Sequence, residues 1–345
     1  MRISAIDSKC GEEVGGPGTT DHDLAHADTV VARRSVTRPA NVPAVVAIFG
    51  PTASGKSELA DALADRLGTG VVSADAMQVY RGLPILTNQP ARPTRLVAIR
   101  DLGETMSVGE YERLAHAAID ELVAAHGHAV VAGGTGLYLR AALSQLELPP
   151  PPPDGLRREL EHTVDELGPA GAHALLAERD PGAAAVVHPN DRRRVVRALE
   201  LAAIGRSLKP AEGRLWSDVM RLPTTLVGLE LGMDELEQRI RRRALLMVER
   251  GAVDEAMSAP AASATAGHVI GLEEFRALPL TDAVEAVVRR TRQYAAYQRK
   301  WLRRLPVDIR LDATRPSDAL VDELEAALGS AIGARAVPGG VGVAD

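Results

Sequence analysis

Two hydrophobic patterns alternate along the chain between about residues 44 and 330. Uninterrupted apolar runs stand at residues 45–49, 70–73, 129–132 and 226–229, and such runs are typical of strands that are buried on both faces. Between the runs, apolar residues recur every three or four positions, as they do along one face of a helix. This alternation of strands and helices predicts an α/β fold with a parallel sheet.

The clearest helical stretch follows the first apolar run. Leu59, Leu63 and Leu67 lie four residues apart and Gly68 comes directly after them, which predicts an amphipathic helix that ends at the glycine. The same patterns predict further helices at residues 109–125, 281–304 and 317–328 and a last strand at residues 308–311.

The segment between the third and the fourth apolar run differs from the rest. Five consecutive prolines at residues 149–153 favour a stiff extended hinge. From residue 155 to about residue 204 the pattern is helical and offers no strand. The sequence therefore predicts an α/β core at residues 42–145 and 211–330, a helical insertion at 146–210, a disordered leader at 1–41 and a flexible tail at 331–345.

Composition and charge narrow the class of protein. The chain has 345 residues, of which 46% are hydrophobic and 25% charged, as in an ordinary globular protein. No apolar run reaches about 18 residues and the polar leader lacks the apolar core of a secretory signal, so we expect no membrane association and a cytoplasmic location. The single cysteine, Cys10, excludes an internal disulfide and a cysteine-based zinc site. A net charge of −6 argues against a uniformly basic nucleic-acid binder.

A glycine-rich sequence lies between the first predicted strand and the first predicted helix. It reads GPTASGKS at residues 50–57 and matches the phosphate-binding pattern GxxxxGK[ST], the alternative being a tight turn without a ligand. Backbone N–H groups of such a loop bind phosphate oxygens, Lys56 adds a positive charge, and the hydroxyl of Ser57 can bind Mg²⁺. The expected diphosphate-binding residues are Gly50, Thr52, Ala53, Ser54, Gly55, Lys56 and Ser57.

The loop indicates a bound diphosphate and does not identify ATP. A nucleotide-hydrolysing enzyme usually carries an acidic residue after an apolar strand, but here the third strand leads into Gly-Gly-Thr-Gly at residues 133–136. Ligands of open α/β sheets bind beyond the carboxyl ends of the strands. Asp75, after the second strand, is therefore a candidate general base or magnesium neighbour, and Thr135 a candidate substrate contact. The alternative for each is a helix N-cap.

Short sequence blocks beyond these turns complete a known pattern. Residues 133–138 read GGTGLY, residues 188–191 read HPND, and residues 197–200 read RALE. Together with the phosphate-binding loop they resemble the tRNA dimethylallyltransferase family. The matching blocks are residues 50–57, 73–82, 133–138, 188–200, 269–274 and 291–301, in the family's order, so the resemblance covers about residues 44–330.

The resemblance implies a P-loop NTPase-like core and an activity. Family members transfer a dimethylallyl group from dimethylallyl diphosphate to N6 of the adenosine 3′ to the tRNA anticodon, with Mg²⁺ and release of pyrophosphate. By this resemblance Asp75 matches the base, Thr135 a contact of the target nucleotide, and Arg292 an arginine that neutralises the diphosphate. The target base has to leave the anticodon stack, and the helical insertion grips the anticodon stem-loop.

Basic residues are concentrated in three strips of this acidic chain, at residues 192–197, 239–243 and 289–304. One strip alone is explained as well by a solvated helix face, but three together favour a phosphate-binding surface. With the resemblance, the expected tRNA contacts are Asp75, Ala76, Met77, Gln78, Thr135, Arg157, Arg192, Arg193, Arg194, Arg197, Gly271 and Gln298. We expect a monomer whose partners are the anticodon stem-loop and dimethylallyl diphosphate, with Ser57 as the metal ligand.

Other functions remain open at this point. A small-molecule P-loop kinase would use the same loop, but it gives the GGT turn and the HPND block no role. An adenine-nucleotide isopentenyltransferase would not need an arginine-rich insertion. A non-catalytic RNA-binding paralogue would not need Lys56, Asp75 and Thr135 together. A diverged family member with a different choice of tRNA is a further alternative.

Overall fold

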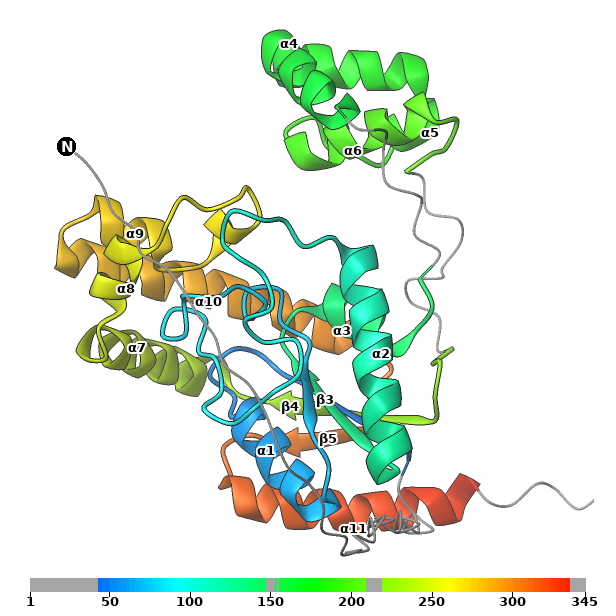
Figure 1. Cartoon of the computed structure of the whole chain (residues 1–345), viewed down its shortest axis with the longest axis vertical. Helices are drawn as coiled ribbons and strands as arrows, with labels where there is room; N and C mark the ends of the chain where they lie inside the picture. The colour runs from blue at the N-terminus through cyan, green and yellow to red at the C-terminus, as the bar shows by residue number, and fades with distance from the viewer. Residues whose placement is uncertain (1–42, 147–152, 154, 209–218, 336–345) are drawn as a thin grey trace, which may run out of the picture. The chain divides into compact units, whose positions relative to one another are not determined.

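The fold is built around β1 (Val45–Phe49), an apolar strand that is buried along its whole length. The computed structural model describes residues 43–146, 153, 155–208 and 219–335 (Figure 1). β1 pairs with β3 (Ala129–Gly133) on one side and with β4 (Thr224–Glu230) on the other. Because both edges of β1 are paired and both faces are covered, an uninterrupted apolar run is the pattern that its position requires.

Five strands form a sheet in the order β2-β3-β1-β4-β5, and all of its pairings are parallel. The outer strands are β2 (Val71–Ser73) and β5 (Ile309–Asp312). Four strands lie at the four runs and β5 lies at the predicted last strand, with ends that differ by up to a few residues. The predicted α/β fold with a parallel sheet is therefore confirmed. Since the strands share one direction, their carboxyl ends meet at one edge of the sheet.

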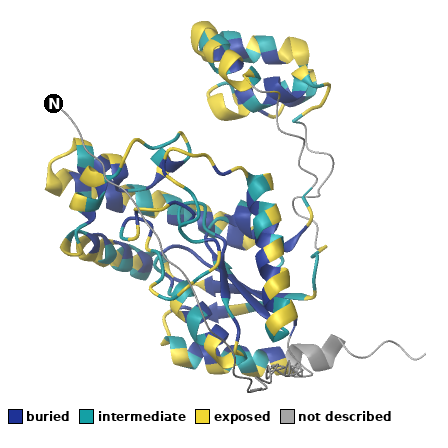
Figure 2. Ribbon diagram, viewed as in Figure 1, coloured by how far each residue is buried: buried dark blue, intermediate teal, exposed yellow. Residues whose placement is uncertain are grey.

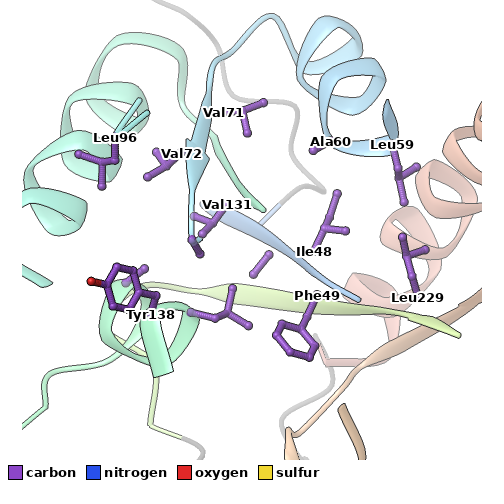
Figure 3. Close-up of a cluster of buried hydrophobic side chains, with 14 of the residues drawn as sticks. Ile48, Phe49, Leu59, Ala60, Val71, Val72, Leu96, Val131, Tyr138 and Leu229 are labelled. Carbon is purple, nitrogen blue, oxygen red and sulfur yellow. The ribbon is translucent and has the colours of Figure 1, made fainter. Parts of the chain in front are cut away.

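Side chains of β1 reach both faces of this sheet. In Figure 3, Ile48 points towards Leu59 and Ala60 of α1 (Lys56–Leu67), whereas Phe49 points to the opposite face. All four side chains are fully buried. Figure 2 shows the same arrangement for the whole sheet, which is buried while the exposed positions lie mainly on helices and loops. The core is thus one apolar layer on each face of the sheet.

Four helices correspond to helical patterns in the sequence. They are α1, α2 (Val108–His126), α10 (Leu280–Arg304) and α11 (Ser317–Arg335). α1 ends at Gly68, as predicted, because its φ of 61° is a left-handed conformation that glycine adopts without a steric penalty. α11 continues to Arg335, beyond the predicted end at residue 328. The rest of the expected tail and the expected leader lie outside the described residues.

Four helices of the core were not predicted. They are α3 (Gly136–Leu143), which directly follows the GGT turn, α7 (Met233–Glu249), α8 (Ala252–Ser258) and α9 (Leu272–Ala277). α7 has a regular apolar face, formed by Leu236, Ile240, Ala244 and Met247. Its arginines stand between these positions, so the segment has the appearance of a basic strip in the sequence.

The segment between β3 and β4 carries a helical unit with a core of its own. It consists of α4 (Leu156–Arg179), α5 (Pro181–Ala184) and α6 (Arg192–Ala203). Within α4 the backbone leaves helical geometry at Gly168, before Pro169, so two helices meet there at a kink. The separate core includes Leu160, Val164, Leu176, Val195 and Leu199. Most of the five-proline run lies outside the described residues.

The chain leaves the core for this unit and returns to it at neighbouring points. On the outgoing side, the Leu146 amide donates a hydrogen bond of 2.8 Å to Glu112 of α2. On the return, the Arg221 amide donates one of 2.8 Å to the Leu143 carbonyl at the end of α3. The sheet continues into β4 a few residues later. Across the described residues, none of the helices is long and apolar enough to cross a membrane.

Candidate active site

Three turns meet at the carboxyl edge of the sheet, after β1, β2 and β3. The turns after β2 and β3 lie so close that a Cβ on Gly133 would stand 2.1 Å from the Ala74 carbonyl oxygen. The amide of Thr135 also donates a 3.3 Å hydrogen bond to that oxygen. Only glycine fits at position 133. The loop after β1 carries the phosphate-binding pattern, so the structure brings this loop, Asp75 and Thr135 to one place.

The phosphate-binding loop has the backbone of an anion site. Gly55 adopts a left-handed conformation with a φ of 84°, and α1 begins at the next residue, Lys56. Ala53 also has a positive φ, 64°, which is uncommon for a residue with a side chain and typical of functional loops. The buried hydroxyl of Ser54 has no hydrogen-bond partner among the described residues. The amino end of α1 therefore faces the loop with its unpaired N–H groups and its partial positive charge.

Lys56 lies among charged groups of opposite sign. Burial lowers the pKa of its ammonium from the usual 10.5 to about 8, the nearby carboxylate of Asp75 raises it, and Arg243 lowers it further. Burial also lowers the pKa of Arg243, while Asp75 raises it. Two cations therefore share one carboxylate in this region. The surplus of positive charge is complementary to a diphosphate.

Arginines of α7 surround the cleft in front of the loop. The Arg243 guanidinium donates a 2.8 Å hydrogen bond to the Thr52 hydroxyl and so contacts the loop directly. The cleft has a volume of about 450 Å³. Its basic lining consists of Lys56, Arg239, Arg242, Arg243 and Arg250, and Ser57 also faces it. This set of cations provides a site for a strongly anionic ligand.

A second cavity adjoins this cleft. It is narrow, about 80 Å³, and the two hollows share Arg243 and Met247 in their walls. Its polar lining includes Thr52, Asp75 and Tyr294. The apolar lining is formed by Met77, Leu86, Ile240, Ala244, Met247, Val269, Ile270 and Val287. A small hydrocarbon group attached to an anion in the cleft would find an apolar environment here, next to a carboxylate.

Neither Asp75 nor Thr135 caps a helix with its side chain. The Asp75 carboxylate accepts a 2.9 Å hydrogen bond from the Met77 amide within a turn, and no helix begins there. Thr135 precedes α3, but its side chain makes no capping bond. Instead its hydroxyl accepts a 3.1 Å hydrogen bond from the Ala76 amide and lies 3.1 Å from the Tyr294 hydroxyl. Thr135 thus stands at the N-cap position of α3 but directs its hydroxyl to Ala76 and Tyr294, and the Asp75 side chain caps no helix.

Three of the residues expected to contact tRNA have structural partners. Gln298, on α10, is 1% exposed, and Gln78 accepts a 2.7 Å hydrogen bond from the Ser73 hydroxyl. Gly271 has a φ of 100° and precedes α9, where Glu274 accepts a hydrogen bond from its amide. Of these three, Gln298 is the most enclosed, and both ends of its side chain bind backbone groups.

Arg292 lies away from the two cavities. Its side chain is 54% exposed and forms an ion pair of 3.3 Å with Glu237 of α7. It does not line the cleft or the apolar cavity among the described residues. Arg243, which belongs to a basic strip of the sequence, contacts the loop at Thr52. The role of Arg292 at the diphosphate stays a prediction from the resemblance.

Several arginines of the helical unit are held by acids within that unit. Arg157 and Arg197 each bind one oxygen of Glu200, at 3.0 Å, and the carboxylate of Glu200 is completely buried. Arg192 forms two hydrogen bonds of 2.7 Å with Asp165. These pairs fix α4 against α6. They also reduce the positive charge that this strip offers to RNA.

Comparison with known proteins identifies the family. The sequence model of the family described as IPP transferase matches residues 78–305, and the model described as isopentenyl transferase matches residues 43–96. The chain belongs to the IPP transferase family. This result confirms the resemblance that six short sequence blocks predicted.

This IPP transferase matches named relatives over most of its length. It is 38% identical over 284 residues to the tRNA dimethylallyltransferase of Streptomyces griseus, a match that covers 78% of this chain and 90% of that protein. It is 40% identical over 274 residues to the tRNA dimethylallyltransferase of Anaeromyxobacter sp. strain K, covering 75% of this chain and 90% of that protein.

Solved structures agree with the fold of this IPP transferase. The full-length tRNA isopentenylpyrophosphate transferase of Bacillus halodurans is similar with a TM-score of 0.57 and 32% identity, over 83% of this chain and 97% of that one. A eukaryotic dimethylallyltransferase acting on tRNA is similar with a TM-score of 0.63 and 29% identity, over 78% of this chain and 73% of that one. The P-loop-like core is thereby confirmed.

The cleft of this IPP transferase contains basic residues that the sequence analysis did not assign to diphosphate. Arg239, Arg242 and Arg243 were grouped only as a basic strip, and Arg250 was not considered. The available signal was helical spacing, because Arg239, Arg243 and Arg250 recur at intervals of four and seven on one side of α7 and just beyond it. Such spacing brings residues to one side only in a helix, and the sequence analysis did not predict a helix at residues 233–249.

Proposed function

We propose that this protein is a tRNA dimethylallyltransferase. It transfers a dimethylallyl group from dimethylallyl diphosphate to N6 of the adenosine 3′ to the anticodon, and pyrophosphate leaves. One observation carries the proposal, namely that a cation-lined cleft at the phosphate-binding loop adjoins an apolar cavity that contains Asp75. The two hollows share Arg243 and Met247, so an anionic head and a short hydrocarbon group of one substrate have adjacent sites.

The reaction exchanges one bond for another at the allylic carbon of the substrate. The bond between this carbon and the diphosphate oxygen breaks, and a bond to N6 of the adenine forms. The electron pair of the broken bond leaves with pyrophosphate, whose charge Lys56 and Arg243 stabilise. The amine loses one proton, and Asp75 accepts it because its carboxylate lines the same cavity. Atoms and charge balance without a further reactant.

The residues present fit a magnesium ion at the loop. The hydroxyl of Ser57 stands in the first turn of α1 and lines the diphosphate cleft. Across the described residues no group of three acidic, histidine or cysteine side chains could hold a metal by itself. Mg²⁺ commonly uses one or two protein ligands together with substrate phosphates and water. When bound, it would neutralise part of the charge on the leaving diphosphate.

The acceptor is placed by the turns after β2 and β3. Thr135 contacts Ala76 and Tyr294, and Tyr294 lines the apolar cavity, so we infer that Thr135 hydrogen-bonds the target nucleotide. An adenine reaches this position only after it leaves the anticodon stack. The tRNA contacts expected from the sequence, the monomeric state and the cytoplasmic location stay predictions.

The test of this function is product formation. The protein is incubated with dimethylallyl diphosphate, Mg²⁺ and unmodified tRNA that carries adenosine 3′ to the anticodon, and the digested RNA is analysed for N6-dimethylallyladenosine. We expect this nucleoside to appear. Product on AMP would favour an adenine-nucleotide isopentenyltransferase, ATP-dependent phosphorylation of a metabolite would favour a kinase, and tRNA binding without product would favour a non-catalytic paralogue.

A further inference from the structure

A buried glutamine of α10 connects the phosphate-binding loop with the GGT turn. The Gln298 side-chain oxygen accepts a 2.7 Å hydrogen bond from the Thr52 amide, and its nitrogen donates a 2.9 Å hydrogen bond to the Gly134 carbonyl. The residue is 1% exposed, so these bonds are shielded from water. A Cβ on Gly134 would lie 2.1 Å from the Gln298 nitrogen, which shows how closely the turn is held.

A tyrosine one turn earlier on α10 connects the same helix with the acceptor side. The Tyr294 hydroxyl lies 3.1 Å from the Thr135 hydroxyl, which also accepts the hydrogen bond from the amide next to Asp75. Tyr294 and Gln298 belong to the same helix and lie four residues apart, so the two side chains stand one above the other on one side of α10. Burial and the charge of Asp75 raise the pKa of Tyr294, so the phenol stays protonated and can donate.

These bonds connect the two sides of the site through α10. The connection begins at Arg243, which binds the Thr52 side chain, passes from the Thr52 amide to Gln298, and continues along one turn of the helix to Tyr294. It ends at Thr135, beside the turn that carries Asp75. The two groups in the middle, Gln298 and Tyr294, belong to one helix, four residues apart. A displacement of the phosphate-binding loop is therefore transmitted to the acceptor turn through a single rigid element.

We propose that Tyr294 and Gln298 are positioning residues that couple the diphosphate site to the acceptor site. The proposal rests on the proposed function. Occupation of the loop by a diphosphate fixes Thr52, and through Gln298 and Tyr294 it fixes Thr135 in the orientation that the target nucleotide requires. RNA then binds to a preorganised turn. Because coupling between two binding events is reciprocal, bound RNA strengthens diphosphate binding by the same factor.

The coupling is measured with inorganic pyrophosphate as the probe. The dissociation constant of unmodified tRNA is determined with Mg²⁺ alone and with Mg²⁺ and saturating pyrophosphate, and the ratio of the two values is the coupling factor. In the unaltered protein we expect pyrophosphate to tighten tRNA binding. In Tyr294→Phe, which loses one hydroxyl and keeps the ring, we expect this factor to fall by about 3- to 10-fold, the effect of one hydrogen bond. The affinity for pyrophosphate alone should stay within about twofold.

Matched controls are available on the same helix. Tyr297 is 54% exposed, so Tyr297→Phe removes an equivalent hydroxyl at the surface and should leave the coupling factor unchanged. Gln298→Met breaks the path at its other link and should lower the factor as Tyr294→Phe does, whereas Gln293→Met, at an exposed position, should not. Melting temperatures report whether each variant is folded. If Gln298→Met is unfolded, the coupling factor of Tyr294→Phe alone decides whether the coupling depends on this connection.

The outcomes separate this proposal from the function on which it rests. If the unaltered protein forms N6-dimethylallyladenosine but pyrophosphate does not tighten tRNA binding, the coupling is refuted and the function stands. The coupling is equally refuted if Tyr294→Phe keeps the full factor. If a lowered factor is accompanied by the same loss in Tyr297→Phe, the path through Thr135 is wrong. Absence of the product in the unaltered protein overturns the proposed function itself.

Discussion

At the scale of single residues, the site depends on an imbalance of charge. Lys56 and Arg243 share the carboxylate of Asp75, so the loop carries a surplus of positive charge that favours an anion. The same two cations lie close to the carboxylate of Asp75, the proposed base. Its role as a base and the roles of the cations can be tested separately, because each side chain belongs to a different element.

Replacement of Asp75 by asparagine should abolish transfer and spare RNA binding. The amide keeps an oxygen that can accept the hydrogen bond from the Met77 amide, so the turn is preserved, but it does not accept a proton at neutral pH. We expect the rate of transfer to fall on the order of 100-fold or more. Single-turnover rates and tRNA dissociation constants are the measurements. An equal loss of RNA binding would contradict the assignment of Asp75 as the base.

Lys56 should make diphosphate binding depend on pH. Its pKa is about 8 in the free protein, and a bound diphosphate favours the charged ammonium. Pyrophosphate affinity should therefore be constant below pH 8 and decrease as the pH rises through that value. Pyrophosphate itself gains charge in this range, so the informative quantity is the affinity of the unaltered protein relative to Lys56→Met. A ratio that does not change between pH 7 and pH 9.5 would show that Lys56 is not the titrating group.

Arg243 should matter more for pyrophosphate than its neighbour Arg241. Arg243→Met removes a half-buried guanidinium that contacts the loop at Thr52, and the loss of one charged hydrogen bond corresponds to about 10- to 100-fold in affinity. Arg241→Met is the matched control, because Arg241 is exposed on the same helix and pairs with Glu285. Titration calorimetry with pyrophosphate and Mg²⁺ distinguishes the two. Similar losses of affinity in both variants would mean that pyrophosphate binding depends only on the net charge of the protein.

At the scale of secondary structure elements, the sheet and four of its helices were predictable from the sequence, but α7 was not. The sequence patterns of β1, α1 and α10 each predict one type of element. β1 is an apolar run because both of its faces are buried, and α1 is an amphipathic stretch that ends at a glycine. α7 was missed because three consecutive arginines dominate its sequence, although its buried face has regular helical spacing. The contact between Arg243 and the loop could not be predicted for the same reason, since it depends on where α7 packs.

The helical unit should be sensitive to Glu200. This carboxylate is completely buried between Arg157 on α4 and Arg197 on α6. Glu200→Gln leaves two guanidinium groups without their acid, which we expect to cost about 1–3 kcal/mol of stability in this unit. Hydrogen exchange of α4 and α6 should increase while that of β1 stays unchanged. Glu178→Gln, at an exposed position on α4, is the control, and equal exchange in both variants would contradict the prediction.

At the scale of the whole molecule, the distribution of charge matters more than its sum. The chain has a net charge of −6, yet the diphosphate cleft is lined by arginines and a lysine. Many other arginines are already paired, as Arg192 is with Asp165. Counting basic residues in the sequence therefore overestimates the charge available to RNA. Only the structure separates the arginines that bind acids from those that remain for a phosphate.

The affinity for tRNA should accordingly decrease with salt concentration. The decrease should be smaller than it would be if every arginine of the three basic strips bound a phosphate. If a few arginines release counterions, an increase from 50 to 200 mM salt should lower the affinity by about 10- to 100-fold. The measurement is the slope of the logarithm of affinity against the logarithm of salt concentration. A loss of several thousandfold would mean that the paired arginines open to bind phosphate, and a flat slope would argue against a phosphate-binding surface.

The hydrogen bond between the Arg221 amide and the Leu143 carbonyl has a consequence for how such an enzyme can change. The chain departs and returns at almost the same point, so the sheet closes whether the excursion between them is long, short or absent. The excursion is therefore a stretch of the gene that can be exchanged without altering the residues of the sheet. If this stretch contacts RNA, as the sequence predicts, a recombinant that carries a relative's excursion between these two residues should keep its catalytic groups and acquire the donor's choice of RNA, which modification assays on a panel of tRNAs would measure.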